Sequence, residues 1–306
     1  MKRWKKVSLI ILSVILVLFL AVGAFAAKVY FDLEKTANKT YEKIDRIKTP
    51  ETRKEEVNVT QGKPFSILLL GIDTGDEGRV DQGRSDSIMV ATVNPQNKKV
   101  TILSIARDTY TDIIGRGTKD KINHAYAFGG APMSIASVEN LLSLPIDFYV
   151  AIDMTGLKEV VDAVGGVNVE NKLAFSYNGS DFPIGKLHLN GQEALNYARM
   201  RYDDPAGDYG RQDRQRAVVS AIIKSAMNLS TLTKYQSVLT AISGNVKTDL
   251  TWNDMKRIQQ EYKSALGTVD SEQLKGDGDM IDGVSYQIIA PEELERVRTL
   301  MQEQLK

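Results

Sequence analysis

A long apolar run near the N-terminus constrains what this chain can fold into more than any other feature. The run extends from Val7 to Ala27 without a charged residue. Four basic residues precede it: Lys2, Arg3, Lys5 and Lys6. A helix of this length crosses a bilayer core of about 30 Å. Because positive charge lies before the run and acidic residues follow it, the sequence predicts a transmembrane signal-anchor over 7–27. Residues 1–6 are then cytoplasmic, and the rest of the chain lies outside the cell membrane.

The segments beside this run carry two further signals. Ala24-Phe25-Ala26 has the small-residue form of a signal-peptide cleavage site, so a cleaved leader is the alternative to an anchor. Residues 28–64 are charged, poor in large apolar side chains, and end at Gly62-Lys63-Pro64. They predict an extracellular stalk, helical at first and looser after Pro50, ahead of a globular extracellular domain over 65–306.

The composition excludes several kinds of chemistry. Lys+Arg and Asp+Glu each number 39 among the 306 residues, so the formal net charge is zero and nucleic acid is not an expected partner. Any basic site must therefore be local. Cysteine is absent, which excludes disulfides, thiolate catalysis and iron–sulfur or zinc–thiolate sites. With His124 and His188 as the only histidines, a zinc site or a Ser-His-Asp triad is not expected, and each is predicted to be structural or on the surface.

Three apolar runs predict neighbouring strands of one sheet. They span 65–73 (FSILLLGID), 87–93 (SIMVATV) and 99–106 (KVTILSIA). The last two are joined by NPQNK, whose Pro and Asn residues indicate a tight turn. The sequence therefore predicts an antiparallel hairpin.

This hairpin predicts a charged rim. The start of its first strand lies beside the end of its second, so Arg84 and Asp86 are expected close to Arg107 and Asp108. Asp73 reaches the same rim if its own strand runs parallel to 99–106. The ends of strands are where open α/β sheets bind their ligands.

Strands and helices alternate through the rest of the chain. Helices are predicted from Pro132, after caps at Thr155 and Asn190, and over 211–228, 232–243, 254–266 and 291–305. Further strands are predicted at 147–153 and 284–290. This order favours an α/β fold: a single three-layer α-β-α domain with a central mixed sheet, preceded by one N-terminal transmembrane helix.

Polar residues from distant segments indicate a phosphate site. They are Lys121, Arg199, Arg201, Arg211, Arg214 and Gln215. The last three share one helical face at the start of the 211–228 helix, and a Gly- and Asp-containing loop precedes it. A helix N-terminus offers free N–H groups, and arginine grips phosphate oxygens through two parallel hydrogen bonds. Any one of these side chains alone is expected to be solvated or weakly ion-paired, so the prediction rests on their combination.

Two aspartates form a candidate site for a metal cation. Asp73 and Asp86, among arginines, suit Mg²⁺, or Mn²⁺ in its place, which binds one or two protein carboxylates together with substrate phosphates. The alternative is that each aspartate only pairs with Arg84 or Arg107.

Residues 68–130 and 189–216 carry separated motifs in a consistent order, among them LLLGID, GRSDSIMV, SIARD, KDKINHAYAFGG and ARMRYDDPAGDYGRQDRQR. With the N-terminal span, they resemble the LytR-CpsA-Psr family of cell-wall glycopolymer ligases, in the branch that attaches wall teichoic acid in Gram-positive bacteria. The family core covers about 65–228. The resemblance implies an enzyme, a phosphotransferase. It would move a phosphate-linked anionic glycopolymer from an undecaprenyl-pyrophosphate carrier to the C6 hydroxyl of peptidoglycan N-acetylmuramic acid, assisted by Mg²⁺.

The resemblance also implies roles for residues. The family's metal aspartates fall on Asp73 and Asp86. Its pyrophosphate-binding residues fall on Arg84, Arg107, Lys121, Arg199, Arg201 and Arg211, with Gln215 beside them. Arg107 is the expected catalytic residue, neutralising charge as the bond to the prenyl phosphate breaks. SIARD stands where the family often has SIPRD, which leaves Arg107 and Asp108 in place.

The sequence leaves three questions open. The base for the acceptor hydroxyl is Asp86 or Asp108. If water is the acceptor in place of the sugar hydroxyl, the protein is a prenyl-pyrophosphate phosphatase. A membrane-anchored regulator without catalysis is the third function, although no helix-turn-helix or basic arm is evident in the predicted cytoplasmic residues.

Overall fold

The computed structural model describes residues 28, 30–32, 34–55, 57–74, 83–227, 238 and 243–306. The predicted stub and span (1–6 and 7–27) and almost all of the predicted helix 232–243 lie outside these residues. None of the helices within the described part has the length and apolar character that a membrane crossing requires.

A six-stranded sheet forms the centre of the domain, in the order β11-β6-β1-β2-β3-β12. Its strands are β1 (Phe65–Ile72), β2 (Ser85–Asn94), β3 (Lys99–Ile105), β6 (Phe148–Asp153), β11 (Val246–Thr248) and β12 (Thr268–Leu274). β1 runs parallel to β6 and β3 parallel to β12, while the other neighbouring pairs are antiparallel. The predicted hairpin and the predicted mixed sheet are therefore both confirmed.

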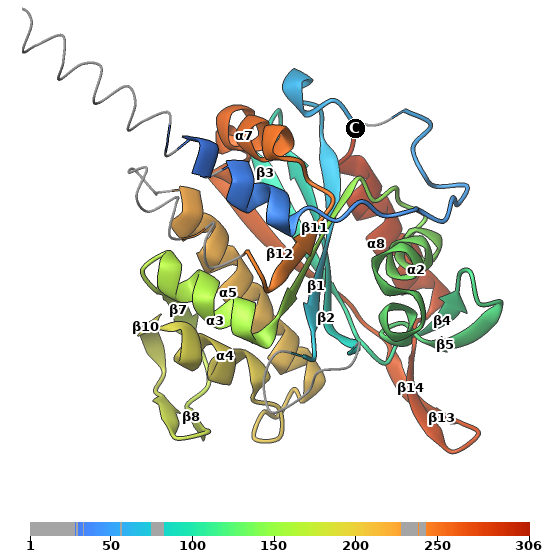
Figure 1. Ribbon diagram of the computed structural model, residues 1–306. Coiled ribbons are helices and arrows are strands. Elements are labelled where there is room, and N and C mark those ends of the chain that lie inside the picture. The colour runs from blue at the N-terminus through green and yellow to red at the C-terminus, as the bar shows by residue number, and fades with distance from the viewer. Residues whose placement is uncertain are drawn as a thin grey trace, which may run out of the picture.

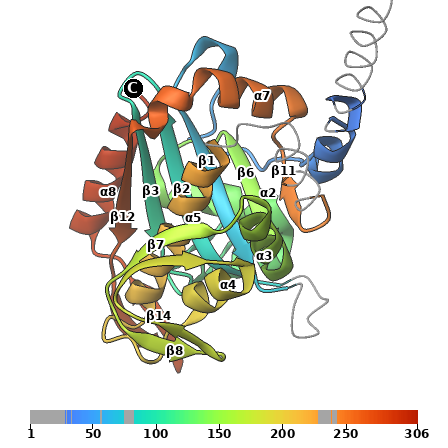
Figure 2. The same ribbon diagram turned by 90° about the vertical axis from the view of Figure 1, so that its left-hand side faces the viewer.

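Helices cover both faces of this sheet (Figures 1 and 2). One face carries α2 (His124–Leu142) and α8 (Pro291–Glu303), and the other carries α3 (Met154–Ala163), α4 (Gly191–Arg199) and α5 (Asp208–Met227). Near the start of β1 lie α7 (Trp252–Glu261) and the short helices η1 (Val59–Gln61) and η2 (Lys263–Gly267). The arrangement is the predicted three-layer α-β-α domain.

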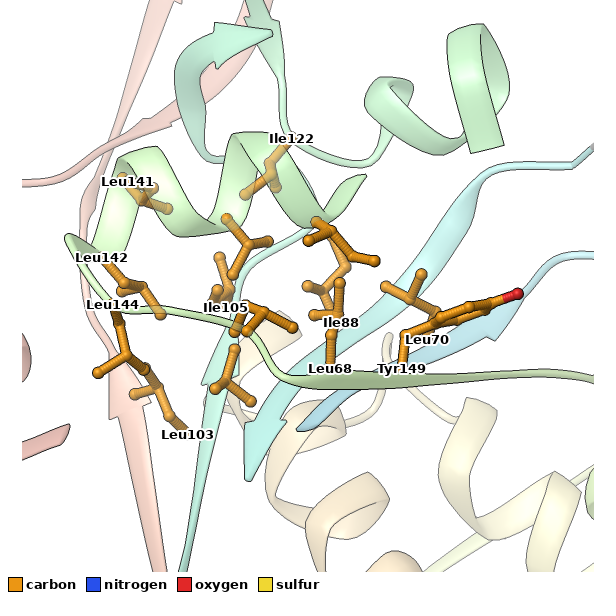
Figure 3. Close-up of a cluster of buried hydrophobic side chains, with 14 of the residues drawn as sticks. Leu68, Leu70, Ile88, Leu103, Ile105, Ile122, Leu141, Leu142, Leu144 and Tyr149 are labelled. Atoms are coloured by element: carbon orange, nitrogen blue, oxygen red, sulfur yellow. The ribbon is translucent and has the colours of Figure 1, made fainter. Parts of the chain in front are cut away.

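The sheet strands are apolar on both faces because both faces are covered. Leu68, Leu70 and Ile88 pack with α2 and α8 in the core that Figure 3 draws. The intervening residues, such as Met89 and Ile102, pack with α5 on the opposite side. This double burial explains why the strands read as continuous apolar runs in the sequence.

In the described part of the chain, four two-stranded ladders lie outside the central sheet. They pair β4 (Tyr110–Ile113) with β5 (Thr118–Lys121), β7 (Val167–Asn171) with β10 (Gly185–Leu189), β8 (Phe175–Tyr177) with β9 (Ser180–Phe182), and β13 (Asp277–Ile281) with β14 (Val284–Ile288). The predicted strand 284–290 is thus part of a separate hairpin rather than of the central sheet. The C-terminal strand in the central sheet is β12, which the sequence does not predict.

Four helix starts differ from the predictions, and one of them is α7, which begins at Trp252 rather than 254. Asp153, not Thr155, caps α3, because its backbone is extended and its carboxylate accepts a 2.7 Å hydrogen bond from the Gly156 amide. α2 begins at His124 and bends at Gly129 and Gly130, so Pro132 follows a kink inside the helix instead of starting it. α5 begins at Asp208 rather than 211. The predicted Asn190 cap is confirmed, as a capping box with Glu193.

The segment 41–55 packs along the domain. The Glu42 amide donates to the Thr248 carbonyl over 2.8 Å, and Arg46 pairs with Asp249 over 2.6 Å. Arg53 pairs with Asp147 over 2.6 Å. This part of the predicted stalk therefore contributes contacts to the folded domain.

Glu139 anchors this segment from within α2. It is 1% exposed and accepts hydrogen bonds from the Thr49 and Thr52 hydroxyls (2.7 and 2.9 Å) and from the Ile146 amide (3.0 Å). We expect Glu139→Ala to lower the free energy of unfolding by about 3 kcal/mol, because three donors lose a charged acceptor. Glu170→Ala, at an exposed position of β7, serves as the control in urea denaturation. Equal stability of the two variants would show that this buried carboxylate does not secure the segment.

Candidate functional site

The rim of the central sheet brings charged residues together as the hairpin predicts. The Asp73 amide donates to the Arg84 carbonyl over 3.0 Å, so the end of β1 lies beside the start of β2. Ile88 and Ile105 face each other in the β2–β3 ladder, and Asp86 and Arg107 continue that register beyond its end. Their side chains meet, with Arg107 Nη1 2.6 Å from Asp86 Oδ2.

Asn123, just before α2, joins this pair. Its amide nitrogen Nδ2 donates to Asp86 Oδ1 over 3.3 Å, and its backbone N–H donates to the Arg107 carbonyl over 3.2 Å. The side chain is buried, and its oxygen Oδ1 finds no hydrogen-bond partner among the described residues. A buried acceptor without a partner is costly unless a ligand satisfies it.

Asp108 connects Arg107 to Lys121. Lys121 Nζ lies 2.8 Å from Asp108 Oδ1, and Arg107 Nε lies 3.8 Å from Asp108 Oδ2. Burial alone would lower the pKa of the Arg107 guanidinium, but Asp86, Asp108 and Asp208 raise it above its ordinary value. Arg107 is therefore a permanent cation held among carboxylates.

The first turn of α5 supplies the other side of the cluster. Arg211 Nη2 lies 2.6 Å from Asp208 Oδ1, and Arg201 Nε lies 3.7 Å from the same oxygen. Arg211 is 8% exposed, and its Nε has no hydrogen-bond partner within the described part of the chain. Burial lowers the pKa of Arg211, Asp208 raises it, and the neighbouring Arg107 and Arg201 lower it further. A buried cation with an unused donor beside other cations is suited to an anionic ligand.

Arg214, one turn along α5, has a structural role instead. It donates to the carbonyls of Tyr197 (3.1 Å) and Met200 and pairs with Asp204. These bonds hold the loop that carries Arg201. Gly210 permits this arrangement, because a Cβ there would lie 2.0 Å from the Asp204 carboxylate.

The C-terminal hairpin also reaches the cluster. The Gln287 backbone N–H donates to the Asp108 backbone carbonyl over 2.9 Å. The Tyr209 hydroxyl donates to the Gln287 side-chain oxygen (3.0 Å) and lies within hydrogen-bonding distance of Gly276. β13 and β14 are thus fixed between the end of β3 and the start of α5, which sequence reasoning missed.

The structure places the remaining predicted residues as follows. Arg84 is exposed at the rim, Arg199 lies half-buried in the last turn of α4, and Gln215 lies half-buried on α5, four residues after Arg211. Their roles stay predictions. Sequence reasoning missed Asn123 and Asp208. The i, i+3 spacing of Asp208 from Arg211 was the available signal for the latter.

The fold and this cluster together define a class: an α-β-α domain that gathers arginines and aspartates at one rim of its sheet. The family model LytR_cpsA_psr matches residues 27–303, so the chain belongs to the LytR_cpsA_psr family. The family predicted from the sequence is therefore confirmed.

Relatives agree with this assignment. The chain is 54% identical over 305 residues to a polyisoprenyl-teichoic acid–peptidoglycan teichoic acid transferase, TagU, of Enterococcus faecalis, covering 100% of this chain and 99% of that protein. A crystal structure of an Enterococcus faecalis protein named as a transcriptional regulator matches with TM-score 0.74 and 48% identity, over 81% of this chain and 90% of that one. A structure of TagT bound to LIIa-WTA matches with TM-score 0.72 and 31% identity, over 86% and 99%. The prediction that the chain is an enzyme is confirmed by its relatives named as transferases.

Arg211 and Arg214 provide a matched pair for testing the site. We expect Arg214→Gln to lower the free energy of unfolding by about 3 kcal/mol or more, because the buried Asp204 carboxylate loses its ion-pair partner. Arg211→Gln should cost much less stability but weaken binding of inorganic pyrophosphate at least about tenfold, through the loss of a charge-assisted contact. Urea denaturation and calorimetric titration measure the two effects. Unchanged pyrophosphate affinity in Arg211→Gln would remove Arg211 from the anion site.

Proposed function

We propose that this chain transfers a phosphate-linked glycopolymer of the wall teichoic acid type from a polyisoprenyl pyrophosphate carrier to peptidoglycan. The observation that carries the proposal is the convergence of four cations from separate segments: Arg107, Lys121, Arg201 and Arg211. The transferases and the TagT complex among its relatives support the choice of substrate.

The arginines would bind and orient the diphosphate. Arg107 has carboxylates on two sides, so its guanidinium is fixed in place before a ligand arrives. Fixed donors stabilise developing charge with little reorganisation, which is the main source of catalysis in phosphoryl transfer. Arg107 would thus neutralise the charge that builds up as the bond to the prenyl phosphate breaks. Arg211 and Lys121 would hold the other phosphate oxygens.

The charge of the cluster favours an additional cation. The four cations contact three carboxylates, Asp86, Asp108 and Asp208, so little positive charge remains for a diphosphate. Asp73 and Asp86 would hold Mg²⁺, or Mn²⁺, and the unpartnered Asn123 oxygen beside Asp86 fits a hard cation. The described residues include no group of three or more His, Cys, Asp or Glu that could hold a metal, so phosphate oxygens would complete the coordination. Bound Mg²⁺ would neutralise charge on the phosphate oxygens and the leaving group.

Asp108 is the better candidate for accepting the proton of the acceptor hydroxyl. Both Asp86 oxygens accept hydrogen bonds, from Arg107 and Asn123. Asp108 Oδ2 lies 3.8 Å from Arg107, beyond hydrogen-bonding distance. In this proposal the acceptor is the C6 hydroxyl of N-acetylmuramic acid, and the predicted anchor over 7–27 holds the site at the outer face of the membrane.

The central role of Arg107 leads to a direct test. We expect Arg107→Ala to reduce transfer from a lipid-linked donor to peptidoglycan by about 1,000-fold or more, because a charge at the reacting phosphate is lost. The thermal midpoint should change little, since Arg107 lies at the rim and not in the core. Arg257→Ala, on the exposed surface of α7, is the matched control. Normal transfer rates in purified Arg107→Ala would rule out this assignment.

Product analysis separates the alternatives. A phosphatase would release polymer phosphate into water at the same rate with or without peptidoglycan, whereas a ligase forms a covalent polymer–glycan product only when glycan is present. A regulator would bind the donor and form neither product. The crystal structure named as a transcriptional regulator makes this third outcome worth measuring.

A further inference from the structure

A second cluster lies beside the phosphate site and takes no part in it. His124 Nδ1 lies 2.8 Å from Asp120 Oδ2, and the Tyr286 hydroxyl makes a long hydrogen bond of 3.5 Å to Asp120 Oδ1. The Tyr286 ring packs edge to face against Tyr110, with 4.9 Å between centroids. The cluster thus joins β4, β5, the start of α2 and the C-terminal hairpin.

Covalent neighbours connect this cluster to the phosphate site. Lys121 follows Asp120 directly, contacts Asp108, and places its Nζ 5.6 Å from the centre of the Tyr286 ring. Asn123 precedes His124 directly and contacts Asp86. A ligand group held by Tyr286 and His124 would therefore be one side chain away from the proposed diphosphate.

The cluster is accessible and chemically mixed. The side chains of His124 and Asp120 are 25% and 26% exposed, so both can reach a ligand while staying paired. Asp120 fixes Nδ1 of the imidazole, and the described residues provide no hydrogen bond to Nε2. Phe128, one turn along α2, packs edge to face on His124 and is 38% exposed. Aromatic surface with a few polar groups that both donate and accept is typical of sites for neutral polar ligands.

The charge of the cluster is mixed, because the Arg116 guanidinium lies 3.6 Å from the Phe128 ring centre and Lys121 lies beside Tyr286, while Asp120 opposes an anion. Desolvation acts to raise the pKa of Asp120, but hydrogen bonds from His124 and from the Lys121 amide bring it below its usual value. The carboxylate is therefore ionised at neutral pH and repels an anion. A carboxylate and an imidazole suit hydroxyl groups. A hydroxyl group can donate a hydrogen bond to the carboxylate, and it can also donate to or accept from the imidazole nitrogen.

We propose that Asp120, His124 and Tyr286 form a saccharide subsite that binds a sugar ring of the glycan next to the diphosphate. The inference rests on the proposed function and names the side chains that hold its carbohydrate. The Tyr286 ring would cover one face of the sugar, while Asp120 and His124 would bind its hydroxyl groups. The sugar belongs either to the peptidoglycan acceptor or to the first residues of the donor polymer.

Equilibrium binding distinguishes these sources without relying on turnover. The full chain in detergent is titrated with peptidoglycan glycan strands, with a lipid-linked teichoic acid precursor, and with inorganic pyrophosphate. We expect Tyr286→Ala and His124→Ala each to lower the affinity for one of the two saccharide ligands about tenfold, because a site that binds hydroxyl groups loses one of its contacts. Weaker binding of the peptidoglycan glycan strands assigns the subsite to the acceptor, and weaker binding of the lipid-linked precursor assigns it to the donor. Pyrophosphate affinity should stay within about twofold in both variants, because the phosphate side chains remain.

Controls separate binding from folding. His188→Ala changes the other histidine, exposed on β10 far from the hairpin, and should leave all three affinities unchanged. Tyr286→Phe keeps the ring and removes the hydroxyl, so it should retain most of the saccharide affinity. The subsite is refuted if both saccharide affinities are unchanged in Tyr286→Ala and His124→Ala. It is also refuted if all three affinities and the thermal midpoint fall together. If the proposed transfer is wrong but the subsite is right, wild-type protein yields no ligated product while this binding pattern persists.

Discussion

The ion pair between Asp86 and Arg107 is the interaction on which the site depends. It exists because β2 and β3 form a tight hairpin. The register of this hairpin places Asp86, near the start of β2, opposite Arg107, which follows the end of β3. Asn123 and Asp108 contact this pair directly. Asn123 bonds to both partners, and Asp108 links Arg107 to Lys121. The Arg211 guanidinium on α5 lies within electrostatic reach of Arg107 and Asp86. The central sheet thus acts as a frame that sets the position of the first charge pair, and the helices add further charges around it.

Segments outside the family core, which the sequence motifs place at about 65–228, also contribute to this frame. The C-terminal hairpin is hydrogen-bonded to the Asp108 backbone and to Tyr209 at the start of α5, so it holds the two sides of the cluster at a fixed separation. Residues 41–55 are bound to α2 and to the loop after β11 by Glu139 and Asp249. The N-terminal segment is thereby joined to the same helix that presents Asn123 and His124.

Much of the fold was predictable because its local signals are strong. The apolar runs of β1, β2 and β3 and the NPQNK turn determine the rim, and Asn190 gives a complete capping box. β12 escaped prediction because its sequence, TVDSEQL, lies at a sheet edge with half-exposed polar residues and shows no apolar run. The C-terminal hairpin did carry a signal. Asp282-Gly283 forms a two-residue turn with positive φ values of 50° and 79°, as Asp-Gly pairs commonly do. The site was predictable only in part, because Asn123 and Tyr209 act through contacts between elements that no local pattern specifies.

The proposed function requires oppositely charged side chains from distant segments to assemble and bind a lipid diphosphate. Mass spectrometry of the intact full-length protein, extracted from membranes in mild detergent, tests this most directly. We expect a co-purified polyisoprenyl phosphate or diphosphate on the wild-type chain and its loss when Arg107 and Arg211 are both replaced by glutamine. Wild-type protein without any phosphorylated lipid, or equal retention of the lipid by the double variant, would contradict the claim.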